Sequence, residues 1–132
     1  MTQTPQPVLT PLTSTAIFLV ATINPGGEAA VHDLIGDVTG LRRAVGFRIL
    51  EGRLAAVVGI GSAAWDRLFT GPRPARLHPF RELQGPRHHA PSTAGDLMFH
   101  IRATEMDLCF EYATHIAARL RDVVTVIDEV HG

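Results

Sequence analysis

Apolar residues recur along this chain with two different periods, which predict strands and helices in a regular order. A continuous apolar run over Ala16–Ile23 is rich in strand-forming residues and ends at Asn24-Pro25-Gly26-Gly27, a sequence typical of a turn. Over Glu28–Val45 the apolar residues are three or four positions apart, which predicts a helix with one apolar face. The chain therefore opens with a strand, a turn and a helix.

The second half of the chain repeats this order. A strand is predicted over Arg53–Ile60, followed by a short helix that ends at Phe69, for which Ser62 is the expected N-cap. The later elements are a strand over Asp96–Ala103, a helix over Glu105–Leu120 and a strand over Val123–Val130. In the first of these strands, one face carries Leu97, Phe99 and Ile101 and the other carries Met98, His100 and Arg102.

Two segments lack such periodicity. Residues 1–14 are polar and rich in proline, which indicates a loose N-terminal arm. Residues 70–95 contain five prolines and three glycines, and we expect a long irregular loop. Loops of more than about 12–15 residues within a compact domain are usually functional or packed against something else. Residues 1–132 are otherwise expected to form one domain.

The order strand-helix-strand-strand-helix-strand is that of the ferredoxin-like α+β fold. It predicts a four-stranded antiparallel sheet with the helices Glu28–Val45 and Glu105–Leu120 on one face. The first and last strands are apolar at nearly every position, which indicates that both faces of the sheet are buried. Something must then cover the face opposite the helices, because an apolar face left in water is an interaction site.

Composition excludes several classes of partner. The chain has 132 residues, 45% of them hydrophobic, and a formal net charge of -1, so a basic face for nucleic acid is not expected. No apolar run is long enough to span a membrane, and the N-terminus lacks the pattern of a signal peptide, so we expect a cytoplasmic protein. Cys109 is the one cysteine and lies on the apolar face of a predicted helix, as a structural thiol would.

The glycine and histidine patterns predict no ligand site. Gly59 and Gly61 follow a strand as in a nucleotide-binding turn, but that turn belongs to parallel sheets, so a tight turn is the better interpretation. His78, His88 and His89 share the long loop, where adjacent histidines bind one metal ion poorly and are more typical of solvated side chains.

The remaining candidates for chemistry are isolated residues. His32 and His115 on predicted helices could in principle ligate a haem iron, but each stands alone at a polar position. Asp128 and Glu129 are adjacent on a strand and therefore point to opposite faces. We expect His100 on the outward face of its strand, Ser62 as a cap and Trp65 as a packed aromatic anchor. The sequence predicts no catalytic, cofactor-binding or metal-ligating residue.

Several segments together carry a family resemblance. These are Val58-Gly59-Ile60-Gly61-Ser62 with Trp65-Asp66, Leu77 to Leu83, Gly95 to Arg102, Asp107 to Glu111, and the closing strand through Gly132. From Val8 onward the chain resembles the N-terminal half of bacterial dye-decolourising (DyP-type) haem peroxidases. It looks like the subgroup that is sometimes packaged in encapsulin shells. Ala94 stands where a proline is expected before Gly95-Asp96, which affects only the stiffness of the loop.

The resemblance implies a two-part enzyme of which this chain is one part. Such enzymes consist of two ferredoxin-like halves and oxidise dyes and phenols with peroxide at haem b. Their proximal His and distal Arg lie in the second half, and their distal Asp lies in the connecting segment, so none of these residues maps onto this sequence. The resemblance thus implies that this chain alone binds no haem stably and is inactive.

The resemblance also implies partners. These are the C-terminal half, packed on the open sheet face, and an encapsulin shell reached through a tail absent here. Two alternatives remain open from the residues: a stand-alone dimeric α+β-barrel protein, in which two copies pack their open faces together, and a non-catalytic binding or assembly module. Without the C-terminal half, apolar strand residues would be left in water and drive association; the candidates are Phe18, Val20, Val57, Phe99 and Ile101.

Overall fold

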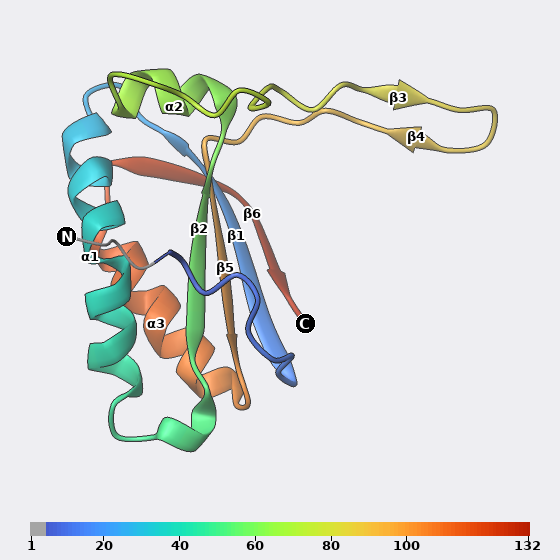
Figure 1. Ribbon diagram of the computed structural model, residues 1–132. Coiled ribbons are helices and arrows are strands. Elements are labelled where there is room, and N and C mark those ends of the chain that lie inside the picture. Colours follow the sequence, from blue (N-terminus) through green and yellow to red (C-terminus); the bar gives the residue numbers. More distant parts are fainter. Residues whose placement is uncertain (1–4) are drawn as a thin grey trace.

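The structure, a computed structural model that describes residues 5–132, is a two-layer α+β domain with a long projecting hairpin (Figure 1). The first four residues of the predicted arm lie outside the described residues. The main elements are β1 (Thr15–Ile23), α1 (Glu28–Gly46), β2 (Ala55–Ile60), α2 (Ser62–Leu68), β5 (Leu97–Ala103), α3 (Met106–Arg119) and β6 (Val124–His131). A 3-10 turn spans Leu50–Gly52, and two short strands, β3 (Leu83–Gln84) and β4 (His89–Ala90), lie within the long loop.

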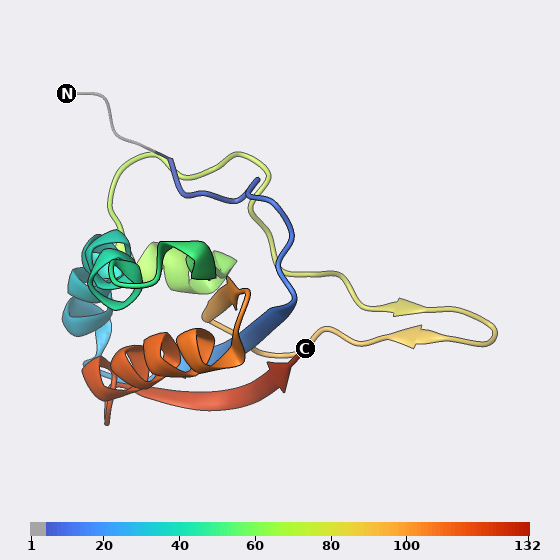
Figure 2. The same cartoon turned by 90° about the horizontal axis from the view of Figure 1, so that it is seen from below.

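The sheet topology confirms the predicted ferredoxin-like fold. The four long strands lie in the order β2-β5-β1-β6, and each neighbouring pair is antiparallel. The two long helices lie on the same side of this sheet (Figures 1 and 2). None of the helices formed by the described residues combines the length and apolarity needed to cross a membrane.

The core lies between the sheet and the two long helices. Side chains alternate along a strand, so one face of each strand points toward the helices. That face of the sheet supplies Ile17, Leu19, Phe99 and Ile101, while α1 supplies Val31, Leu34 and Val38, and α3 supplies Leu108, Cys109, Tyr112 and Ile116. Tyr112 is completely buried, and its hydroxyl donates a hydrogen bond to the carbonyl of Val38, 3.2 Å away. The apolar stripes seen in the sequence therefore meet as predicted.

The start of β2 differs from its prediction. The strand begins at Ala55 rather than at Arg53, because the turn over Leu50–Gly52 ends with Arg53 in the left-handed region, at φ 51°. An extended strand cannot include a residue in that conformation.

The predicted N-cap at Ser62 is wrong. Gly61 precedes the first turn of α2 in an extended conformation, and no side chain caps the helix. The hydroxyl of Ser62 accepts a hydrogen bond from Arg73, 2.6 Å away. Arg73 also forms an ion pair with Asp66 and donates to the carbonyl of Leu77, so it holds the start of the long loop against α2.

Gly61 fixes the junction between β2, α2 and β5. Its amide donates to the carbonyl of Asp96, 2.8 Å away. A Cβ atom at Gly61 would lie 2.7 Å from the carbonyl oxygen of Gly95, which is closer than real Cβ contacts. Gly61 thus allows two backbones to approach closely, whereas Gly59 and Ile60 belong to β2, so the predicted turn is confined to Gly61.

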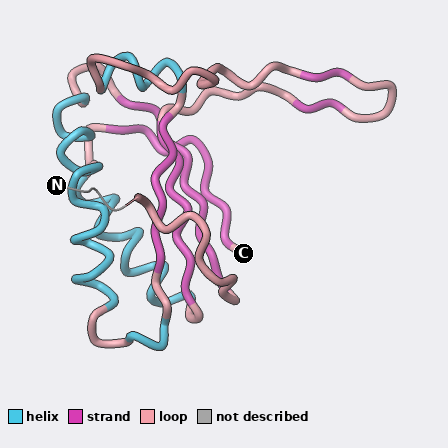
Figure 3. Tube along the Cα trace, in the orientation of Figure 1, coloured by secondary structure: helices cyan, strands magenta, loops and turns pink. Residues whose placement is uncertain are grey.

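The long loop is more regular than predicted. Residues 70–95 leave the domain, form the hairpin of β3 and β4, and return to β5 (Figure 3). Leu83 pairs with Ala90 and Gln84 with His89, which leaves Pro86 and Arg87 beyond the closing Gly85–His88 pair. The hairpin projects away from the sheet and does not lie flat on it (Figures 1 and 2).

The described part of the N-terminal arm is attached to the sheet rather than loose. The side-chain amide of Gln6 donates to the carbonyl of Val58 at 3.0 Å, and its oxygen accepts from the amide of Val58 at 2.8 Å. Gln6 thereby occupies backbone groups on the free edge of β2, which an edge strand would otherwise expose.

Candidate functional site

The face of the sheet opposite the helices, called here the open face, is the most conspicuous surface of the domain. Its central row crosses all four strands, because Val57 pairs with His100, His100 with Phe18, and Phe18 with Val130. In the next row, Met98 pairs with Val20 and Val20 with Asp128. Most of these side chains are apolar.

Phe18 and His100 form the centre of the open face. Their rings are stacked, with centroids 4.3 Å apart and an angle of 14° between the planes. Partial burial lowers the pKa of His100, and the nearby charge of Arg102 lowers it further. His100 is therefore neutral near pH 7, and its ring extends the apolar surface of Phe18 rather than adding a charge.

The N-terminal arm covers one end of the open face. Arg102 is only 8% exposed, and it donates hydrogen bonds to the carbonyl of Val8, 2.9 Å away, and to the hydroxyl of Thr10. Its Nε atom is buried without a hydrogen-bond partner among the described residues. The guanidinium thus ties the arm across β5 and does not face a ligand.

The remainder of the open face is accessible. Phe18 is 36% exposed, Met98 40% and Val130 49%. The prediction that both faces of the sheet are buried is therefore wrong for this chain, since β6, the last strand, is exposed along most of its length. Phe99 and Ile101 are not part of this surface, because both side chains point into the core. Phe18, Val20 and Val57 do belong to it.

The histidines do not converge on a site. His32 and His115 are exposed on the helices, and the Nδ1 atom of His78 lies 2.7 Å from the carbonyl oxygen of Pro79. His89 is paired with Glu82 in the hairpin. Among residues 5–132 no group of three histidine, cysteine or acidic side chains is arranged to hold a metal ion.

The surroundings of the other candidate residues indicate structural roles. Cys109 is completely buried, and burial raises the pKa of its thiol, as expected for a structural cysteine. Trp65 packs on Phe69, with ring centroids 4.6 Å apart, and Phe69 in turn contacts His32. Asp128 pairs with Val20 of the open face, whereas Glu129 lines a hollow on the helix side, so the two carboxylates point apart as predicted.

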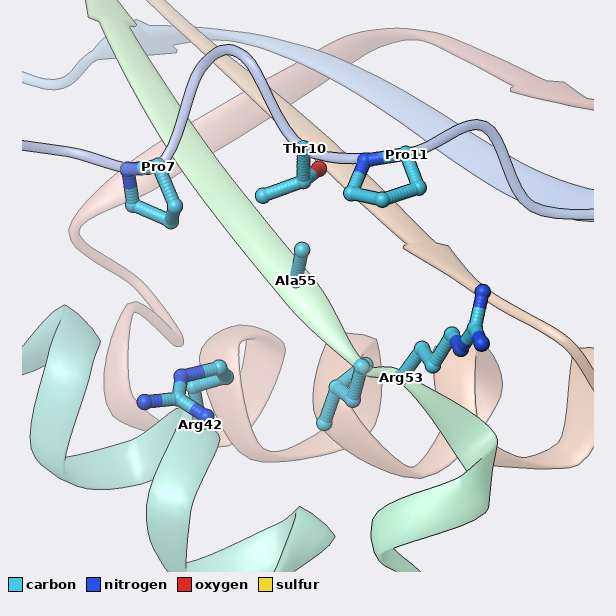
Figure 4. Close-up of a pocket in the computed structure, with 7 residues that line it drawn as sticks. Pro7, Thr10, Pro11, Arg42, Arg53 and Ala55 are labelled. Atoms are coloured by element: carbon cyan, nitrogen blue, oxygen red, sulfur yellow. The ribbon is translucent and has the colours of Figure 1, made fainter.

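One cavity lies at the free edge of β2, beneath the N-terminal arm (Figure 4). It has a volume of about 440 Å³ and is lined by Pro7, Thr10, Pro11, Arg42, Arg53, Leu54 and Ala55. Figure 4 shows the guanidinium groups of Arg42 and Arg53 on opposite sides of the view, pointing away from one another. They do not form a clamp for one anion.

Comparison with known proteins identifies the family of this domain. The family described as Dyp-type peroxidase, N-terminal, matches residues 5–132. The chain belongs to this family. Its DyP-type relatives include the dye-decolorizing peroxidases of Rhodococcus erythropolis, 68% identical over 128 residues, and of Mycobacterium tuberculosis, 63% identical over 128 residues. Each alignment covers 97% of this chain but 38% of the relative, so the chain spans well under half of their length.

Solved DyP-type structures share the fold. The encapsulated DyP-type peroxidase from Mycobacterium smegmatis superposes with a TM-score of 0.94 at 60% identity, covering 97% of this chain and 41% of that one. DyPB from Rhodococcus jostii RHA1 gives a TM-score of 0.92 at 49% identity, covering 98% and 42%. A variant of the Rhodococcus jostii protein has been solved in complex with heme.

Sequence reasoning missed two residues that shape this surface. Both residues hold the N-terminal arm against the sheet. Gln6 bonds to Val58, 52 positions later in the chain, and Arg102 bonds to Val8, 94 positions earlier. The alternation in β5 places Arg102 on the open face, but no local pattern indicates that backbone carbonyls of the arm will cover it.

Proposed function

We propose that this chain is the N-terminal half of a dye-decolourising peroxidase that uses haem b and peroxide to oxidise dyes and phenols. In this proposal the chain supplies no catalytic residue and no haem ligand. Its role is to present the open face, on which the second half of the enzyme packs. The 68% identity to a dye-decolorizing peroxidase over nearly the whole chain is the observation that carries the proposal.

The described side chains do not fit a haem site of their own. An axial histidine has to face an apolar cavity that encloses the porphyrin. His78 lines a hollow of about 550 Å³ and His32 one of about 340 Å³, but both rings are exposed and polar side chains lie beside them. The proposal therefore places haem binding and the chemistry of peroxide in the second half.

The open face supports the assembly of two halves. Burial of apolar surface contributes about 25 cal/mol per Å², so covering several hundred Å² stabilises a complex by several kcal/mol before the entropic cost of association. Phe18, Met98 and Val130 are the exposed apolar side chains that such a contact would cover. The neutral His100 adds its ring to this surface without a charge to desolvate.

A second copy of the chain is the alternative occupant of the open face. The same exposed residues would then meet their equivalents across a two-fold axis, as in a dimeric α+β barrel. We also propose a cytoplasmic protein that is cargo of an encapsulin shell, on the analogy of the encapsulated relative from Mycobacterium smegmatis. The shell would bind a tail outside this chain.

The proposal is tested by reading the gene beyond Gly132 and measuring the haem content of its product. We expect the reading frame to continue through a Gly-x-x-Asp-Gly segment and a haem-ligating histidine. The purified longer protein should show a Soret band that corresponds to one haem per chain. A longer product that binds no haem would contradict the proposal, as would stoichiometric haem in the 132-residue chain.

A further inference from the structure

The hairpin between α2 and β5 is a projecting element without a partner in this chain. Every residue from His78 to His89 is exposed. Its hydrogen bonds join the hairpin to itself: Gly85 donates to the carbonyl of His88, and His89 pairs with Glu82. Among the described residues, no hydrogen bond or ion pair links residues 79–90 to the sheet or to the helices.

Such a hairpin is not expected to hold its shape alone. An isolated two-stranded hairpin is marginally stable in water, and this one has only two paired positions in its short strands. It also exposes two large apolar side chains, since Phe80 is 57% exposed and Leu83 is 53% exposed. Both features are typical of an element that packs on another surface.

We infer that the hairpin, residues 77–92, is a strap that packs on the part of the longer protein that follows Gly132. The inference rests on the proposed function, because that function supplies the following part. The hairpin projects from the sheet toward the side away from the long helices, and the chain ends on that same side (Figures 1 and 2). The following residues therefore start beneath the overhanging hairpin, beside the open face.

The reach of the hairpin suits this role. From Pro79 to Gly85 the chain makes six residue-to-residue steps, which at about 3.3 Å each span about 20 Å. This is about the depth of one sheet layer together with one helix layer, because packed layers lie roughly 10 Å apart. A half-domain seated on the open face would thus be flanked by the hairpin along much of its side.

The side chains of the hairpin indicate what kind of surface it packs against. Arg81 and Arg87 form no ion pair with the described residues, whereas the one acidic side chain of the hairpin, Glu82, is already paired with His89. The docking surface should therefore combine an apolar patch for Phe80 and Leu83 with carboxylates near Arg87 at the tip.

Photo-crosslinking in the longer protein tests the inference. A benzophenone amino acid replaces Leu83 in the hairpin or, as a control, Leu50, which is 78% exposed near the opposite end of the domain. Equal amounts of unlabelled and ¹⁵N-labelled protein are mixed before irradiation, so that mass spectrometry separates links within one chain from links between chains. We expect position 83 to link within one chain to peptides beyond Gly132, at several times the yield of position 50.

The other outcomes overturn the inference. Links from position 83 only between chains would show that a second copy holds the hairpin. Links only to residues 5–132, or a yield no higher than at position 50, would show that it has no partner after Gly132.

Hydrogen exchange supplies a second reading and separates this inference from the proposed function. Amides of residues 80–90 should exchange at least tenfold more slowly in the longer protein than in the 132-residue chain. The double variant Phe80→Ser with Leu83→Ser should abolish this difference, whereas Leu50→Ser should not. If the longer protein carries haem but the exchange of residues 80–90 is unchanged, the inference about the hairpin is overturned and the proposed function is not. If the longer protein carries no haem, the proposed function is overturned, whatever the exchange of the hairpin amides.

Discussion

The ring of Phe18 on β1 stacks on the ring of His100 on β5, with 4.3 Å between centroids, at the centre of a sheet face that no helix covers. Both rings lie on the same face because side chains alternate along a strand, and partial burial keeps the imidazole of His100 neutral. This neutral aromatic surface is the feature through which we expect the domain to assemble.

The first prediction concerns this surface. We expect the 132-residue chain to self-associate at tens of micromolar, and Phe18→Glu to reduce this association at least tenfold, because a charge would have to be desolvated at the contact. Sedimentation velocity measures the effect. Phe110→Glu, on α3 at the helix side of the sheet and 63% exposed in the wild type, is the matched control and should leave association unchanged. A monomeric wild-type chain, or equal effects of both variants, would argue against an assembly role.

A second prediction follows from the lowered pKa of His100. The unfolded chain takes up a proton on this residue near pH 6.5, whereas the native protein does so only at a lower pH. The unfolded state therefore binds more protons between those two values, and the stability of the native state falls as the pH falls through this window. In urea titrations from pH 7.5 to 5.5, His100→Gln should lose less stability on acidification than the wild type. Identical pH profiles would show that His100 is not the group responsible.

The N-terminal arm gives a third prediction. Gln6→Ala removes both hydrogen bonds to Val58, at 2.8 and 3.0 Å, and each such bond contributes about 1 kcal/mol. The amide of Val58 on the free edge of β2 should then exchange with solvent several times faster. Exchange of the amide of Ile101, in the central strand β5, serves as the internal control. An unchanged Val58 amide would mean that the arm does not protect this edge.

The fourth prediction compares two glycines. Gly61→Ala should destabilise the protein by about 1–3 kcal/mol, because the added methyl would press on the carbonyl oxygen of Gly95 and the backbone would have to move. Gly36→Ala, in α1, meets no atom within 4 Å and should stabilise the helix by up to about 1 kcal/mol. Thermal unfolding of the two variants shows whether each substitution stabilises or destabilises the protein. A stabilising effect of Gly61→Ala would refute the close approach at this junction.

The helices and strands of the core could be predicted from the sequence because their signals are local. The apolar stripe over Glu28–Val45 gives α1 to within one residue, and the alternation from Leu97 onward separates the two faces of β5. The hairpin was missed for the opposite reason. Its strands are two residues long, and its Pro-Arg connection lacks the Asn-Gly pattern typical of tight hairpins.

Contacts between distant segments could not be predicted. Ser62 is of a residue type favoured at N-caps and stands at the start of α2, but its hydroxyl accepts a hydrogen bond from Arg73, eleven residues later. Similarly, the covering of Arg102 depends on where the first ten residues run, and no periodicity encodes that path. The assignment of no catalytic residue to this chain remains a prediction, since it depends on the second half of the enzyme.

Peroxide-dependent dye oxidation tests the central claim most directly. The longer protein, encoded by the gene through and beyond Gly132, is compared with the 132-residue chain at equal concentration, each supplied with haemin, hydrogen peroxide and an anthraquinone dye. The account predicts rapid bleaching by the longer protein and, for the 132-residue chain, no bleaching above that of free haemin. Bleaching above free haemin by the 132-residue chain, or none by the longer protein, would contradict it.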